Sequence, residues 1–154
     1  YKSMTHEGGI STPLIVHWPR VIKEQAGKIT HHAGCLIDVM PTILEASGVK
    51  YPETFHNGNT IHPSEGISLL PVFKTGKGTE HEYMFWEHQH NCAIRKGKWK
   101  AVKKLEDQSW ELYHIEKDRI ESNNLSAAHP EIVKELNDKW YEWAEHHDVL
   151  PKKK

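Results

Sequence analysis

One lysine near the start of the chain stands where it could serve chemistry. In the stretch YKSMTHEGGI, Lys2 is followed by His6 and by a Glu-Gly-Gly cluster at positions 7–9. A fixed ammonium group stabilises negative charge that develops on oxygen atoms during hydrolysis. Lysines also lie on solvated surfaces in most proteins, so this pattern alone leaves both interpretations open. His6 could face a pocket, where it would contact substrate, or merely the surface.

A second group of polar residues lies in the stretch EHQHNCAIR. Its candidates for substrate binding are Glu87, His88, His90 and Asn91. Histidine and asparagine side chains can instead satisfy backbone groups of a turn, so both interpretations of His88 and Asn91 stay open. Two histidines two positions apart on one strand could also chelate a metal, although a closed zinc site needs about four ligands.

The composition limits the class of protein. The 154 residues include 20 Lys and Arg against 21 Asp and Glu, with a formal net charge of -1. Nucleic acid is not expected as a partner, because proteins that bind phosphate backbones normally carry a basic excess. No apolar run approaches the roughly 20 residues that a bilayer span needs. Two cysteines, Cys35 and Cys92, are too few for a disulfide scaffold.

The first half of the chain predicts the end of a larger α/β domain. The apolar run at residues 14–16, bracketed by prolines, is typical of a short strand buried on both faces. Its partner strands are not found in this sequence, so we expect them in a longer protein of which this chain is a fragment. A helix is expected to start near Asp38 and end at Gly48, and a helical turn is expected around residues 68–73.

The second half predicts a small α+β subdomain. Four strand-like runs cover residues 83–87, 92–95, 98–103 and 110–115, and Gly97 suits a tight hairpin between the second and third. An apolar stripe at helical spacing follows Pro130 and predicts one long helix across this sheet. We therefore expect two domains, residues 1–78 and residues 79–154.

Taken in order, these motifs resemble the C-terminal third of the sulfatase family, the arylsulfatase-like hydrolases of the alkaline-phosphatase superfamily. The resemblance covers essentially the whole chain. It rests on K-x-x-T-x-E-G-G followed by TPLIV, and on IDVMPTILEASG, EGISLLP, WEHQHNCAIRKGKWKAV, WELYHIEKDRIESNNL and HPEIVKELNDKWYEWA. The fold that it implies is an α+β fragment: the end of an α/β catalytic domain, then a small four-stranded antiparallel sheet packed on a long C-terminal helix.

The resemblance implies that the parent protein hydrolyses sulfate esters of aryl alcohols or carbohydrates. In that family, the lysine that matches Lys2 contacts oxygens of the sulfate ester. The nucleophile is a formylglycine made from a cysteine in a C-x-[PA]-x-R context, beside a divalent cation that is usually calcium. Neither Cys35 nor Cys92 has that context. We therefore expect the nucleophile and the calcium ligands in the missing N-terminal portion, and expect this fragment alone to be inactive and to hold no metal.

Members of the family often have E-H-x-G-N-x-A-[VI]-R where this chain has EHQHNCAIR, at the mouth of the active site. Glu87, His88 and Asn91 match that pattern, whereas His90 replaces a common glycine and Cys92 a common arginine. The substrate contacts at this place are therefore expected to differ from those of other members.

The resemblance also implies a location, which is the periplasm or the outside of the cell, or the lysosome if the parent protein is eukaryotic. Two alternatives to a sulfatase fragment remain from the residues alone. One is a non-catalytic interaction module built from the sheet and helix. The other is a His-rich metal-binding domain, suggested by the 13 histidines and their adjacent pairs.

Overall fold

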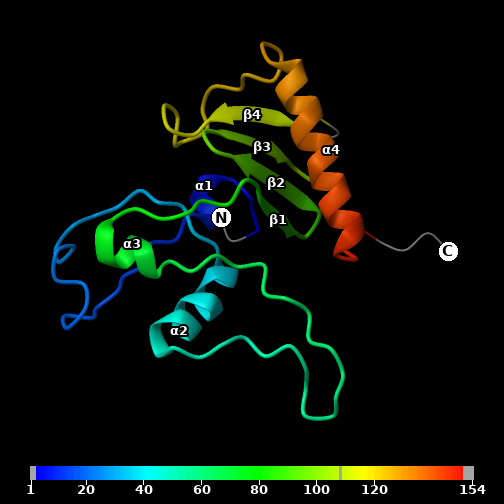
Figure 1. Cartoon of the computed structure of the whole chain (residues 1–154). Coiled ribbons are helices and arrows are strands. Elements are labelled where there is room, and N and C mark those ends of the chain that lie inside the picture. The colour runs from blue at the N-terminus through cyan, green and yellow to red at the C-terminus, as the bar shows by residue number, and fades with distance from the viewer. Residues whose placement is uncertain (1–2, 108, 151–154) are drawn as a thin grey trace. The chain divides into compact units, whose positions relative to one another are not determined.

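The computed structural model describes residues 3–107 and 109–150 (Figure 1). The chain divides into two compact units. The sheet unit consists of Tyr1–Pro13 and Glu82–Lys154, and the α2–α3 unit consists of Leu14–His81. The first residues of the chain thus group with its second half. The assignment of residues 1–78 to an α/β catalytic domain stays a prediction about the longer protein.

The sheet unit is built on four antiparallel strands in the order β1-β2-β3-β4. They are β1 (Met84–His88), β2 (Asn91–Lys96), β3 (Trp99–Lys103) and β4 (Glu111–His114). Each strand falls within one residue of a strand-like run expected from the sequence, and Gly97 adopts a φ of 53° in the tight turn between β2 and β3. The α+β fold class is therefore confirmed.

The long helix α4 (Pro130–His146) crosses the strands on one face of the sheet (Figure 1). It begins at Pro130, because proline fits the first helical position, where its missing N–H has no intrahelical partner. Leu136, Trp140 and Ala144 recur at helical spacing and are buried. They pack in one cluster with strand residues of this face, which are Cys92, Ile94, Ala101, Trp110 and Leu112.

The opposite face of the sheet carries a second, smaller cluster. It consists of Ala93, Val102, Tyr113 and Ile115, with Trp86 packed against it. Successive side chains of a strand point to opposite faces, so β2 and β3 contribute alternate residues to the two clusters. The central strands are consequently buried on both sides.

In the α2–α3 unit, the short helices are arranged around one buried carboxylate. A 3-10 turn (Leu36–Asp38) leads into α2 (Val39–Ser47), which ends at Gly48 with a φ of 71°. The Asp38 carboxylate accepts the backbone N–H groups of Cys35 at 2.7 Å and Ile67 at 2.8 Å. The predicted helix start near Asp38 is confirmed, and α3 (Leu70–Thr75) lies close to the expected helical turn.

The expected buried strand at residues 14–16 is absent from the structure. Leu14 is 60% exposed and Ile15 is 89% exposed, and neither belongs to a strand. The sequence predicts partner strands for it in a longer protein, and a buried strand needs such neighbours to pair its backbone groups, so this strand stays a prediction about the longer protein. Among the described residues, none supplies such a neighbour, since the four strands form their own sheet and the isolated bridge joins Thr54 to Thr60.

Candidate functional site

The segment that follows the candidate catalytic lysine is fixed to the start of β2. Lys2 itself lies outside the described residues. The next residue, Ser3, has its backbone oxygen 3.0 Å from the Asn91 side-chain nitrogen that donates to it. Thr5 is 1% exposed, and its hydroxyl donates to the Cys92 backbone oxygen at 3.1 Å. Two consecutive residues of β2 thus hold the chain one and three positions beyond Lys2.

The His6 side chain lies in a cluster of polar side chains at β4. Its Nε2 lies 3.3 Å from Glu111 Oε2, which also accepts the Tyr113 hydroxyl at 2.8 Å, while Lys104 binds Oε1 at 3.0 Å. Burial by itself raises the pKa of Glu111, but the hydrogen bonds from Lys104, Tyr113 and His6 outweigh it and lower the pKa below its ordinary value. The substrate-binding role of His6 stays a prediction.

The helix α1 (Glu7–Ile10) is held by a buried cluster of charges that the sequence did not reveal. The Lys100 side chain is 0% exposed, and its Nζ lies 2.9 Å from Glu7 Oε1 and 2.9 Å from Glu121 Oε1. The backbone N–H of Glu7 donates to Glu121 Oε2 at 2.7 Å. Arg119 lies 3.7 Å from the other Glu7 oxygen. An ammonium group this far from water needs such carboxylate partners.

The contact between Lys100 and Glu121 differs in kind from the contact with Glu7. The ammonium donates a hydrogen bond to Glu7, whereas no donor among the described residues is directed at Glu121 Oε1 with hydrogen-bond geometry. The short distance to Glu121 Oε1 is therefore an ion pair. Alternation along β3 could have indicated this cluster, because Lys100 and the buried Val102 point to the same face.

The turn between β1 and β2 carries the candidate histidines. His88 is the last residue of β1, and Gln89 and His90 form the turn with φ values of 50° and 65°. Two central residues with positive φ are typical of the tight hairpin turns that favour glycine or asparagine. A glycine at the position of His90 would adopt this conformation without the steric cost of a side chain. Both histidines are exposed, and Glu87 Oε1 accepts the His90 backbone N–H at 2.7 Å.

The Asn91 side chain forms hydrogen bonds with backbone groups. Its nitrogen donates to Ser3 O at 3.0 Å and to His88 O at 3.3 Å, and its oxygen accepts the Leu105 N–H at 3.1 Å. These contacts are the turn role that the sequence left open for Asn91. One amide thus contacts both Ser3 and the last residue of β1, His88. The substrate-binding roles of Glu87, His88, His90 and Asn91 stay predictions.

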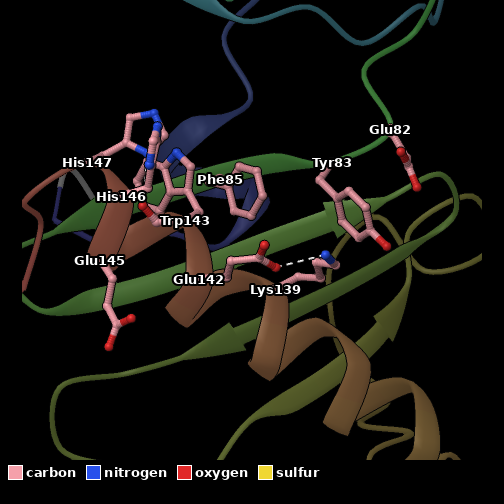
Figure 2. A pocket seen from close by; sticks show the side chains of 9 residues that line it. All are labelled: Glu82, Tyr83, Phe85, Lys139, Glu142, Trp143, Glu145, His146 and His147. Carbon is pink, nitrogen blue, oxygen red and sulfur yellow. Dashed lines mark hydrogen bonds and ion pairs between the residues drawn. The ribbon is translucent and has the colours of Figure 1, made fainter.

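A hollow of about 770 Å³ lies elsewhere, between β1 and the C-terminal half of α4 (Figure 2). Stacked rings line it, with the Phe85 and Trp143 centroids 5.0 Å apart, and Lys139 pairs with Glu142 at 2.8 Å. None of the five described candidates lines it. The geometry therefore gives this hollow no part in the predicted chemistry.

The α2–α3 unit holds a group of three possible metal ligands, Cys35, Asp38 and His81, whose donor atoms lie within 4.8 Å of one another. His81 Nε2 is 2.7 Å from Asp38 Oδ1, which is a hydrogen-bond distance. Burial, followed by the nearby Asp38 charge, raises the pKa of the Cys35 thiol to about 11. Calcium prefers about six to eight oxygen ligands, so a thiol, an imidazole and one carboxylate already bound to backbone groups do not fit it.

Among the residues that the structure describes, no helix is both long enough and apolar enough to cross a membrane.

Comparison with known proteins places the chain in a family. Residues 1–146 match the family model described as N-sulphoglucosamine sulphohydrolase, C-terminal. An uncharacterized sulfatase of Schizosaccharomyces pombe is 34% identical over 144 residues, which cover 90% of this chain and 26% of that protein. The N-acetylgalactosamine-6-sulfatase of Sus scrofa is 29% identical over 127 residues, covering 82% of this chain and 23% of the relative.

Solved structures agree with this match. A crystal structure of Ps i-CgsB in complex with k-i-k-neocarrahexaose superposes with a TM-score of 0.65 at 26% identity, covering 83% of this chain and 27% of that one. The chain spans about a quarter of the length of the relatives that it matches. Because a family model matches nearly its whole length, the chain belongs to the sulfatase family and corresponds to the C-terminal region of its members.

Proposed function

We propose that this chain is the C-terminal part of an enzyme that hydrolyses sulfate esters, and that Lys2 serves in its active site. The observation that carries the proposal is the family match over residues 1–146, which includes the motif that begins at Lys2. The ammonium of Lys2 would bind the sulfate oxygens and stabilise the charge that develops on the leaving-group oxygen as the S–O bond breaks.

The nucleophile and the metal belong to the N-terminal portion of the parent enzyme. A formylglycine beside calcium is proposed there because the cysteines of this chain lack the required context and the Cys35 group does not fit calcium. This chain's own residues would then bind and orient the ester. On its own, the chain is expected to be inactive.

Of the two substrate classes expected, aryl and carbohydrate sulfates, a carbohydrate sulfate is the one that the following relatives favour. One relative is named an N-acetylgalactosamine-6-sulfatase, and one structural neighbour is a complex with a neocarrahexaose. The exposed hairpin side chains Glu87, His88 and His90 are proposed to recognise the sugar, together with His6 and Asn91 from the adjacent segments. The location proposed from the family is periplasmic or extracellular, or lysosomal in a eukaryote.

The exposed apolar side chains of the α2–α3 unit support the proposal that another part of the enzyme covers this unit. Several large side chains of this unit are exposed, among them Leu14, Ile15, Ile29, Leu36, Ile37, Met40 and Ile43. Exposed apolar side chains in such number mark a surface that another part of a protein covers. The proposed cover is the N-terminal catalytic portion of the same enzyme, whose sheet would also pair with residues 14–16. Residues 1–78 would belong to that catalytic domain, and residues 79–154 to the C-terminal subdomain.

The test compares this chain with the longer protein that contains it. Both are assayed side by side on an aryl sulfate and on a sulfated sugar, with calcium present and formylglycine formation verified. Hydrolysis by the longer protein only is the expected result. Hydrolysis by neither, in spite of correct folding, would argue for an interaction module. Hydrolysis by the short chain would show that its own residues suffice.

A further inference from the structure

We propose that Cys35, Asp38 and His81 form a binding site for a zinc ion. The three residues belong to the α2–α3 unit, and none of them is among the residues proposed for sulfate-ester hydrolysis. This site is therefore separate from the calcium site of the proposed function. It also departs from the expectation that this chain holds no metal, which concerned the calcium of the sulfatase mechanism.

The three side chains converge although they come from separate places in the sequence. Cys35 and Asp38 lie at the two ends of the 3-10 turn before α2, and His81 lies 43 positions beyond Asp38, between α3 and β1. One sulfur, one carboxylate oxygen and one ring nitrogen lie within 4.8 Å of one another. In a tetrahedral zinc site such atoms are about 3.3–3.8 Å apart, because each lies about 2.0–2.3 Å from the ion. Small side-chain movements would therefore let all three bind one ion.

Asp38 is fixed in the way that a metal-binding carboxylate usually is. Its side chain is 0% exposed, and its oxygens accept the backbone N–H groups of Cys35 at 2.7 Å and Ile67 at 2.8 Å. An ionised carboxylate has about four lone-pair positions, so two backbone hydrogen bonds leave room for an ion. Hydrogen bonds to a ligating carboxylate are typical of metal sites, since they set its direction.

The donor atoms determine which kind of ion fits. Calcium and magnesium are bound by oxygen atoms, and only one of these three residues supplies one. A thiolate, an imidazole and a carboxylate are the three kinds of side chain that bind zinc in proteins. Three protein ligands leave a fourth position for water, and the His81 side chain is 13% exposed, so solvent reaches the group.

Without an ion, the group consists of a hydrogen-bonded pair beside a protonated thiol. His81 Nε2 lies 2.7 Å from Asp38 Oδ1, and burial raises the pKa of the Cys35 thiol to about 11. Zinc would replace this hydrogen bond with bonds from both residues to the metal, and the imidazole would bind in its neutral form. As the bond between sulfur and zinc forms, the thiol would release its proton to water.

A purely structural role is the competing explanation, because the hydrogen bond between His81 and Asp38 also stabilises the loop on α2. Cobalt(II) separates the two explanations, since it occupies zinc sites and has a visible spectrum. A thiolate bound to cobalt adds an intense charge-transfer absorption in the near ultraviolet, which imidazole and carboxylate ligands do not give. Cobalt that binds only to surface histidines, of which the chain offers many, therefore lacks this absorption.

The experiment titrates Co(II) into the full-length enzyme after a chelator has removed its metals and calcium has been restored. We expect sulfur-to-cobalt absorption that saturates at one equivalent and disappears when Zn(II) is added. Cys35→Ser should abolish the absorption, and its hydroxyl can still accept the Asp38 N–H as the thiol does. Cys92→Ser, which changes the other cysteine of the chain, is the matched control and should keep the absorption.

His81→Ala provides a second variant, in case Cys35→Ser folds poorly. It should weaken cobalt binding by about tenfold or more, because even the loss of a residue that supports a ligand costs about 10–100-fold in metal affinity. The exposed His62→Ala is its control and should bind as the unmutated enzyme does. Absence of the sulfur-to-cobalt absorption, or its persistence in Cys35→Ser, would overturn the proposal. Because the readout is not sulfate-ester hydrolysis, neither result bears on the proposed function.

Discussion

Lys100 on β3 and Glu7 on α1 are joined by a hydrogen bond of 2.9 Å, and the lysine side chain is shielded completely from solvent. The two residues lie 93 positions apart in the sequence. Their pairing ties the first helix of the chain to the centre of the sheet. It also explains why the first 13 residues group with the C-terminal half rather than with the residues that follow them.

Removal of the Lys100 charge should strongly destabilise the sheet unit. Lys100→Met keeps most of the side-chain volume but leaves Glu7 and Glu121 without their buried cation, which typically costs about 3–5 kcal/mol. Urea unfolding followed by tryptophan fluorescence measures the change. The exposed Lys98→Met is the control, with an expected change within about 0.5 kcal/mol. Similar effects of the two substitutions would show that the buried cluster contributes little.

The core under α4 should be sensitive to truncation. Leu136 is 0% exposed, so Leu136→Ala leaves a cavity and should cost about 2–5 kcal/mol of unfolding free energy. Leu105 is 57% exposed, and Leu105→Ala should have a much smaller effect. Thermal unfolding of both variants checks the difference. A loss below about 1 kcal/mol for Leu136→Ala would mean that α4 packs less closely than the structure shows.

Acid should weaken the His6 cluster through Glu111. The folded-state pKa of Glu111 lies below its ordinary value of 4.5. Its contribution to stability is therefore fully present above that value and is lost as the pH falls through the lower folded-state pKa. The free energy of unfolding, measured from pH 6 downward, should decline less steeply for Glu111→Gln than for the unmutated chain. Glu116→Gln, at an exposed position, is the control. Parallel curves for Glu111→Gln and the unmutated chain would contradict the lowered pKa of Glu111.

A glycine at position 90 should separate the backbone strain at this residue from the proposed role of its imidazole in recognising a sugar. His90 has a φ of 65°, a conformation that glycine adopts without the steric cost of a side chain. His90→Gly should therefore keep or slightly raise stability, by up to about 1 kcal/mol. In the full-length enzyme it should change the preference between a sulfated sugar and a small aryl sulfate, if His90 recognises the sugar. His88→Gly, at the end of β1, should instead lower stability. A destabilised His90→Gly variant would show that the imidazole itself supports the turn.

Local sequence patterns predicted much of the fold. The four strands, the turn at Gly97 and the helix after Pro130 follow from alternation, turn chemistry and helical periodicity, which act over a few residues. The strand at residues 14–16 is not formed in this chain, because its pairing depends on neighbours rather than on its own composition, and it stays a prediction about the longer protein. The apolar run is real, but the described part of the chain offers it no partner strand.

The candidate site was predictable only in part. The hairpin residues were chosen from their motif and their substrate-binding roles stay predictions, whereas the contacts of Asn91 agree with the backbone role that the sequence left open for it. The contacts of Thr5 and Lys100 were not foreseen, because each joins residues nearly ninety or more positions apart. In a sequence, a buried lysine cannot be told from an exposed one by residue type alone. Only its place on β3, on the same face as the buried Val102, could have indicated that Lys100 is buried.

The proposed catalytic role of Lys2 is tested most directly by the turnover of Lys2→Ala in the full-length enzyme on a sulfate ester. Lys50→Ala, on an exposed loop, is the control for loss of a lysine as such. Lys2→Ala should lower kcat by about a hundredfold or more, the scale typical of losing a group that stabilises transition-state charge. A fall of less than about tenfold, with Lys50→Ala unchanged, would contradict the central role of Lys2.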